Sequence, residues 1–245
     1  KMVVNSLLEK CDPQRRDVFM SALLRYYRRP ERLDDTTAFQ LLETATALPL
    51  ELCSSQQQYD LLDFAQSLSQ RQDVTVRTAA VLLLDYLSQR LSVRDILQHS
   101  LQAVPCADCR SLALLRALAL SRLDGSESPS LTEEDISAIF LDNLKTATPW
   151  ILKEANIRLL EHSARRDGRQ LLHIATHLTN LIKVSDRVTV RHTAGAALLE
   201  VAPLLTPGER NEIAVELTRG LEIDQQEFSK YIPGYLGQFC LWLPP

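Results

Sequence analysis

The sequence contains an internal repeat, and this feature constrains its fold more than any other. The four residues Val74–Arg77 recur unchanged as Val188–Arg191, at an offset of 114 residues, or three periods of 38. The apolar residues after each copy recur at steps 0, 4, 7, 8, 11 and 15, the pattern of a helix with one buried face. They are Val76, Ala80, Leu83, Leu84, Leu87 and Leu91 in the first copy, and Val190, Ala194, Ala197, Leu198, Val201 and Leu205 in the second.

The same apolar pattern occurs at other multiples of 38 residues. One period beyond the second copy all six steps are apolar, although the residues differ: Phe228, Ile232, Tyr235, Leu236, Phe239 and Leu243. One period before each copy the agreement is partial, at Ala38, Leu42 and Ala45 and at Leu152, Leu159 and Leu160. Around Leu114 and Leu118 only the first turn fits. The pattern predicts six helices that start near residues 36, 74, 108, 149, 188 and 226.

Capping sequences predict a second set of helices between these six. Side-chain caps accept hydrogen bonds from the unpaired amides of a helix start, and box-like caps occur at Ser92-x-x-Asp95, Thr132-x-x-Asp135 and Thr206-x-x-Glu209. The repeating unit is therefore a helix, a short turn and a second helix, and neither helix can bury its apolar face without the next unit. We predict an all-α superhelix, or solenoid, of about six helical hairpins that forms a single domain over residues 1–245.

Composition agrees with a helical, soluble chain. Only 7 glycines and 6% aromatic residues favour helix over sheet, and the net charge of −4 provides no overall attraction to nucleic acid or to an anionic membrane. The odd number of cysteines, five, indicates reduced thiols. No stretch approaches the roughly 18 apolar residues of a membrane span. We expect an intracellular, cytoplasmic protein that has no membrane partner.

Residues Asp73–Ala80 resemble the opening of the second helix in a HEAT repeat, with an acid, a Val-Arg pair and a small residue. The resemblance to the HEAT and armadillo families implies a scaffold that binds another protein or a peptide segment on a concave surface lined by the second helices. It also implies a ladder between neighbouring repeats, in which Asp73, Arg77 and Arg191 are structural. Alternatively, Arg77, Lys153 and Arg191, each one step past the template origin, form a cationic stripe for an acidic partner.

Trp150 and Glu154 support an enzymatic alternative. They are similar to an aromatic residue and an acid in the HEAT-like alkylpurine DNA glycosylases, where such residues line the DNA site. Residues 149–192 hold eight basic side chains, Arg158 among them, against four acidic ones. The alternative is therefore a nucleic-acid-binding or glycosylase-like protein. Because the sequence lacks a glycine-rich phosphate loop or a nucleophile elbow, we favour binding over catalysis.

Two groups of potential metal ligands occur in the sequence, and neither predicts a metal or another cofactor. Four histidines fall in one region, at His162, His173, His177 and His192, but no carboxylate lies at ligand spacing, so we expect solvated or capping histidines. The pair Cys106 and Cys109 has no further ligands nearby except His99 and is expected to be plain thiols. The candidate binding residues are Arg77, Trp150, Lys153, Glu154, Arg158, Arg191 and His192.

The C-terminal end is unusually apolar. Residues 231–245 contain no charged side chain, and Cys240, Leu241 and Trp242 add apolar surface outside the helical stripe. A terminal repeat normally presents a polar outer face. We therefore expect the natural chain to continue beyond Pro245, or this end to pack on another subunit.

Overall fold

The computed structural model describes residues 12–242 except 47, 49, 92, 169 and 223–228. This described part contains helices, short 3₁₀ turns and connecting segments but no strand, so the all-α prediction is confirmed. The chain divides into two compact units, Lys1–Pro129 and Ser130–Pro245. None of the described helices is long and apolar enough to cross a membrane.

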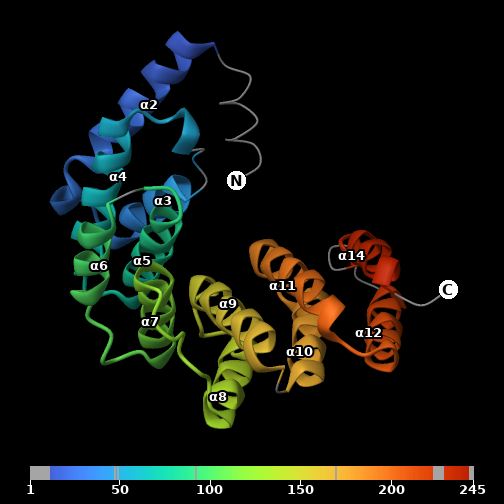
Figure 1. Ribbon diagram of the computed structural model, residues 1–245. Coiled ribbons are helices and arrows are strands. Elements are labelled where there is room, and N and C mark those ends of the chain that lie inside the picture. The colour runs from blue at the N-terminus through green and yellow to red at the C-terminus, as the bar shows by residue number, and fades with distance from the viewer. Residues whose placement is uncertain are drawn as a thin grey trace. The chain divides into compact units, whose positions relative to one another are not determined.

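The first unit consists of helical hairpins packed in two layers (Figure 1). Helices α2, α4 and α6 contact one another in chain order, and helices α3, α5 and α7 do the same. The six helices are α2 (Pro13–Tyr27), α3 (Asp35–Ala45), α4 (Ser55–Leu68), α5 (Val74–Ser88), α6 (Arg94–Gln102) and α7 (Arg110–Asp124). Each second helix therefore packs on the second helix of the next hairpin within this unit.

The second helices of the second unit also pack in chain order. Helix α9 contacts α11, α11 contacts α14, and α10 contacts α12, while α8 packs on α9. The helices are α8 (Glu133–Leu144), α9 (Trp150–Asp167), α10 (Leu171–Val184), α11 (Val188–Val201), α12 (Pro207–Arg219) and α14 (Ile232–Phe239). Positive φ angles of 70° at Gly125 and 65° at Gly168 end α7 and α9, a conformation that glycine adopts without a Cβ penalty.

The helix starts agree with the period read from the sequence. The five second helices predicted near residues 36, 74, 108, 149 and 188 begin at residues 35, 74, 110, 150 and 188. The predicted start near 226 lies outside the described residues, as does the Ser92 cap. Capping boxes at Thr132 with Asp135 and at Thr206 with Glu209 are confirmed, and an additional one forms between Ser54 and Gln57.

The predicted apolar stripes form the core of each unit. All six stripe residues from Val190 to Leu205 are buried, and five of the six from Val76 to Leu91 are buried, while Leu91 is half-buried. In α14 the stripe is incomplete, because Ile232 and Phe239 are buried whereas Tyr235 and Leu236 are half-exposed. Phe228 and Leu243 lie outside the described residues.

Polar contacts between neighbouring hairpins repeat at about the same spacing as the helices. Side-chain hydrogen bonds join residues 32 to 39 positions apart within each unit, and seven pairs serve as examples. The pairs are Arg28 with Asp60, Arg71 with Asp35, Tyr86 with the Leu48 carbonyl, Arg122 with Asp85, Asn143 with His177, Lys183 with Glu216, and Thr193 with Glu154. The spacing matches one sequence period, as expected for equivalent units stacked side by side.

Candidate functional site

Arg77 lies in the first unit and links two successive hairpins. It is buried near the start of α5, and its Nη2 lies 2.5 Å from Oδ2 of Asp108, which precedes α7. The hydrogen bond from Arg77 lowers the pKa of Asp108. Asp73 caps α5 by accepting from the amides of Thr75 and Val76. Arg77 therefore bonds the acid that precedes the next second helix, whereas Asp73 caps its own helix.

Lys153 occupies the equivalent step in the second unit but has different surroundings. Its side chain lies on α9, and the residue is only 8% exposed. Its ammonium forms no ion pair or hydrogen bond with any residue that the structure describes. The half-buried Lys183 in this unit is instead paired, because its Nζ lies 3.0 Å from Glu216 Oε2. A cation on a mostly covered residue that has no protein partner can accept an anionic group, which makes Lys153 a candidate for anion binding.

Glu154 connects α9 to α11. This carboxylate is buried and accepts a hydrogen bond of 3.2 Å from the Thr193 hydroxyl, 39 residues later. Trp150, the first residue of α9, and Arg158 are both half-buried. The Glu154 carboxylate is thus part of the contact between two second helices.

Arg191 packs against an aromatic ring supplied by the next hairpin. The residue is buried in α11, and its guanidinium carbon lies 5.2 Å from the centre of the Tyr231 ring. Lys230 Nζ lies 5.1 Å from the same ring. Cations at this distance from an aromatic face are attracted by the ring quadrupole. Two cations, Arg191 and Lys230, therefore lie close to the Tyr231 ring where α11 meets the start of α14.

His192 and Tyr235 form a second contact between α11 and α14. The exposed His192 ring places Nδ1 2.6 Å from the Tyr235 hydroxyl, and its edge meets the Tyr231 ring at 5.0 Å between centroids. Burial raises the pKa of Tyr235, and the neighbouring Tyr231 adds to this effect. The Tyr235 ring lies directly over Gly195, where a Cβ atom would overlap it.

We refer to Lys153, Arg191, His192, Tyr231 and Tyr235 as the second-helix face. The sequence predicted the first three, whereas Tyr231 and Tyr235 were recognised only as part of an apolar C-terminal segment. Gly195 lies inside a predicted helix, and such a glycine indicates that a neighbouring residue approaches the helix backbone closely. Arg77 belongs to the other unit.

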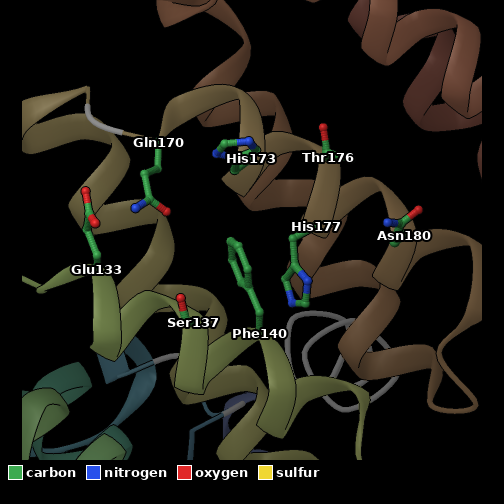
Figure 2. Close-up of a pocket in the computed structure, with 8 residues that line it drawn as sticks. All are labelled: Glu133, Ser137, Phe140, Gln170, His173, Thr176, His177 and Asn180. Carbon is green, nitrogen blue, oxygen red and sulfur yellow. The ribbon is translucent and has the colours of Figure 1, made fainter.

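A groove with a different character lies between α8 and α10 (Figure 2). It encloses about 610 Å³ and is lined by Glu133, Ser137, Phe140, Gln170, His173, Thr176, His177 and Asn180. The rings of Phe140 and His177 stack with centroids 4.2 Å apart and an interplanar angle of 20°. Gln170, at the start of α10, has a φ of 54° and is the one non-glycine residue with positive φ in the described part of the chain.

His177 is the buried centre of a polar network that joins three helices. Its Nε2 lies 3.1 Å from the side-chain amide nitrogen of Asn143 in α8, whose carbonyl oxygen accepts from Asn156 in α9. Because the Asn143 amide donates, His177 Nε2 accepts and the ring proton resides on Nδ1. Burial lowers the pKa of His177 to about 4.

The expectation of solvated or capping histidines is wrong for His177. His173 and His192 are exposed and His162 is half-buried, but His177 is only 7% exposed and is stacked on Phe140. The period of four placed His173 and His177 on one helical side, yet one residue faces solvent and the other packs against α8. Burial depends on the neighbouring helix, which the spacing alone does not reveal.

The cysteine pair forms a backbone turn. Cys106 and Cys109 are half-buried, and the Cys109 amide donates to the Cys106 carbonyl at 3.2 Å. Across the described residues, no group of three or more His, Cys, Asp or Glu side chains is arranged to hold a metal ion.

Comparison of the chain with protein-family models, with curated proteins and with solved structures finds no match.

Proposed function

We propose that the chain is a HEAT- or armadillo-like helical-repeat scaffold of about six hairpins, and that its second helices bind an acidic segment of a partner protein. The ordered contacts of second helices within each unit support the repeat arrangement. Polar contacts at one-period separations support it as well. In such arrays each hairpin contacts only its neighbours, and the aligned helices form an extended binding surface.

Lys153 is the observation that carries the functional part of this proposal. Lys153 as a whole residue is only 8% exposed, and the described residues provide no carboxylate for its ammonium. Its Nζ is not among the unpartnered polar atoms that are fully buried, so this atom keeps contact with solvent. A carboxylate from a partner would complete this site with a charge-assisted hydrogen bond.

Two tyrosines that contact helix α11 favour a peptide over a small anion. Tyr231 and Tyr235 are half-exposed, and they are held by Arg191 and His192 respectively. Half-exposed aromatic rings next to positive charge are typical of protein-binding surfaces, where they provide contact area at low entropic cost. The surface thus combines one unpaired cation with rings suited to packing against a main chain.

The test is a titration of the protein with an acetylated, amidated deca-glutamate peptide, measured by fluorescence anisotropy. Lys153→Met is expected to weaken binding about tenfold, the effect of losing one hydrogen bond between charged groups. Lys183→Met is the matched control, because it removes the same charge from α10, where the ammonium already pairs with Glu216. This control is expected to bind the peptide like the wild type.

Stability provides a second readout for the same two variants. Lys153→Met is expected to keep or raise the melting temperature, since it removes a cation that has no partner among the described residues, whereas Lys183→Met is expected to lower it. Equal effects of the two substitutions on peptide affinity would contradict the proposal. Tight binding of a DNA duplex with a steep salt dependence, in place of the peptide, would favour the nucleic-acid alternative.

A further inference from the structure

We propose that the groove between α8 and α10 is a second binding site, and that it takes a short extended protein segment carrying an arginine or lysine side chain. This site is separate from the second-helix face, since it lies on first helices and involves the opposite charge. The inference does not depend on the proposed function.

The shape of the groove fits a short extended segment. Figure 2 shows Glu133 near Gln170 at one end and Phe140 beside His177 further along. Members of each pair are 37 residues apart, so equivalent positions of two successive first helices form the two walls. Glu133 and Phe140 are seven residues apart on α8, or about 10 Å at the helical rise. Three extended residues cover about that length.

The charge of the lining selects a basic side chain at one end. Glu133 is the one acidic residue among the eight that line the groove, and no lysine or arginine is present there. Its side chain is exposed in the first turn of α8. An anionic ligand would be repelled at this end, whereas a guanidinium or ammonium would be attracted.

His177 supplies a hydrogen-bond donor at the other end. The residue is more than nine-tenths buried, and its Nε2 is occupied by Asn143. Its Nδ1–H has no partner among the residues that the structure describes, although the ring lines the groove. A main-chain carbonyl of a bound segment would accept from it, and the stacked Phe140 ring would pack against that segment. Carboxamides and hydroxyls of Gln170, Asn180, Ser137 and Thr176 offer further bonds to a peptide backbone.

The experiment follows the side-chain amide signals of Gln170 and Asn180 by NMR during titration with acetyl-Arg-Ala-Ala-Ala-amide. We expect saturable shifts of these signals, and weaker or no binding of acetyl-Glu-Ala-Ala-Ala-amide. Glu133→Gln should weaken the arginine peptide about fivefold, the upper range for an exposed ion pair. Glu134→Gln is the matched control, because it removes the same charge from the same helical turn but does not line the groove. It should leave the affinity unchanged.

Three results would overturn the inference. The first is the absence of saturable shifts at the groove with the wild-type protein. The second is an equal loss of affinity in Glu133→Gln and Glu134→Gln, which would show a general charge effect. The third is binding of acetyl-arginine-amide as tightly as of the tetrapeptide, which would show that the groove recognises a side chain without an extended segment.

Discussion

At the residue scale, the polar network of Asn156, Asn143 and His177 joins three helices beside the groove. All three residues are buried, and their side chains link α9, α8 and α10 through two hydrogen bonds of 3.1 Å. Buried polar groups are stable when they are hydrogen-bonded and costly when one partner is lost. The network therefore holds the imidazole in one tautomer beside the groove.

The first prediction concerns the pH dependence of folding. The pKa of His177 is lowered from 6.5 to about 4 by burial, so between these values the unfolded chain holds a proton that the folded chain does not. Stability from this residue is present in full above about pH 6.5 and is lost as the pH falls toward 4. The difference corresponds to at most roughly 3 kcal/mol.

Urea unfolding between pH 4 and 7 checks this prediction. His177→Gln retains an acceptor for Asn143 but does not titrate, so its stability should depend less on pH than that of the wild type. His173→Gln, one turn earlier on the exposed side of α10, should retain the wild-type slope. A wild-type slope in His177→Gln would show that the buried imidazole does not control the pH dependence.

The sequence predicts some of the candidate binding residues but not their partners. Lys153 and Arg191 were predicted as equivalent positions because they follow the same step of the period. Arg77 pairs with Asp108, whereas Lys153 has no partner among the described residues. The difference depends on which acids the next hairpin brings close, and a local sequence pattern does not contain that information. Tyr231 and Tyr235 were missed as binding residues because apolar periodicity does not distinguish a half-exposed ring from a buried one.

At the scale of elements, the contact between α11 and α14 depends on a residue with no side chain. Tyr235 lies over Gly195, and its hydroxyl bonds to His192 one turn earlier in α11. Glycine inside a helix ordinarily costs about 1 kcal/mol relative to alanine, so the gain must come from the ring contact. Gly195 thus allows the last described helix to pack closely on its neighbour.

The second prediction follows from this contact. Gly195→Ala should lower stability by about 1 to 3 kcal/mol in spite of the better helix propensity, because the new Cβ displaces Tyr235 and breaks its bond to His192. Gly208→Ala in α12 is the control, since a Cβ there meets no atom within 4 Å, and it should leave stability unchanged or raise it. Thermal unfolding of both variants measures these changes in stability. A more stable Gly195→Ala would mean that Tyr235 does not occupy this position.

Helix positions were the most predictable property of the chain. Five second helices start within two residues of the prediction because the apolar period reports directly which face each helix buries. The largest difference is α7, which begins at Arg110 because residues 107 and 108 form a turn after Pro105. Degenerate copies of the period, such as the one near Leu114, indicate that a helix is present but fix its starting residue less sharply.

At the scale of the whole molecule, each unit repeats one packing rule, in which every hairpin contacts the next. The rule explains why polar contacts recur at separations close to 38 residues. The apolar C-terminal end fits the rule less well, since Leu241 is 82% and Trp242 43% exposed. The contact of Arg210 with the Trp242 carbonyl holds this end against α12.

Small-angle X-ray scattering of the monomer tests most directly whether the two units continue one array of six stacked hairpins. Helices packed 8–10 Å apart in such an array give a particle roughly 60 Å or more in its longest dimension. A compact globule of 245 residues has a radius of gyration of about 18 Å and a longest dimension of about 50 Å. The account predicts a longest dimension above about 60 Å, with a radius of gyration clearly greater than that of the globule. A scattering curve that fits the compact globule would contradict the repeat array and the extended binding surface that depends on it.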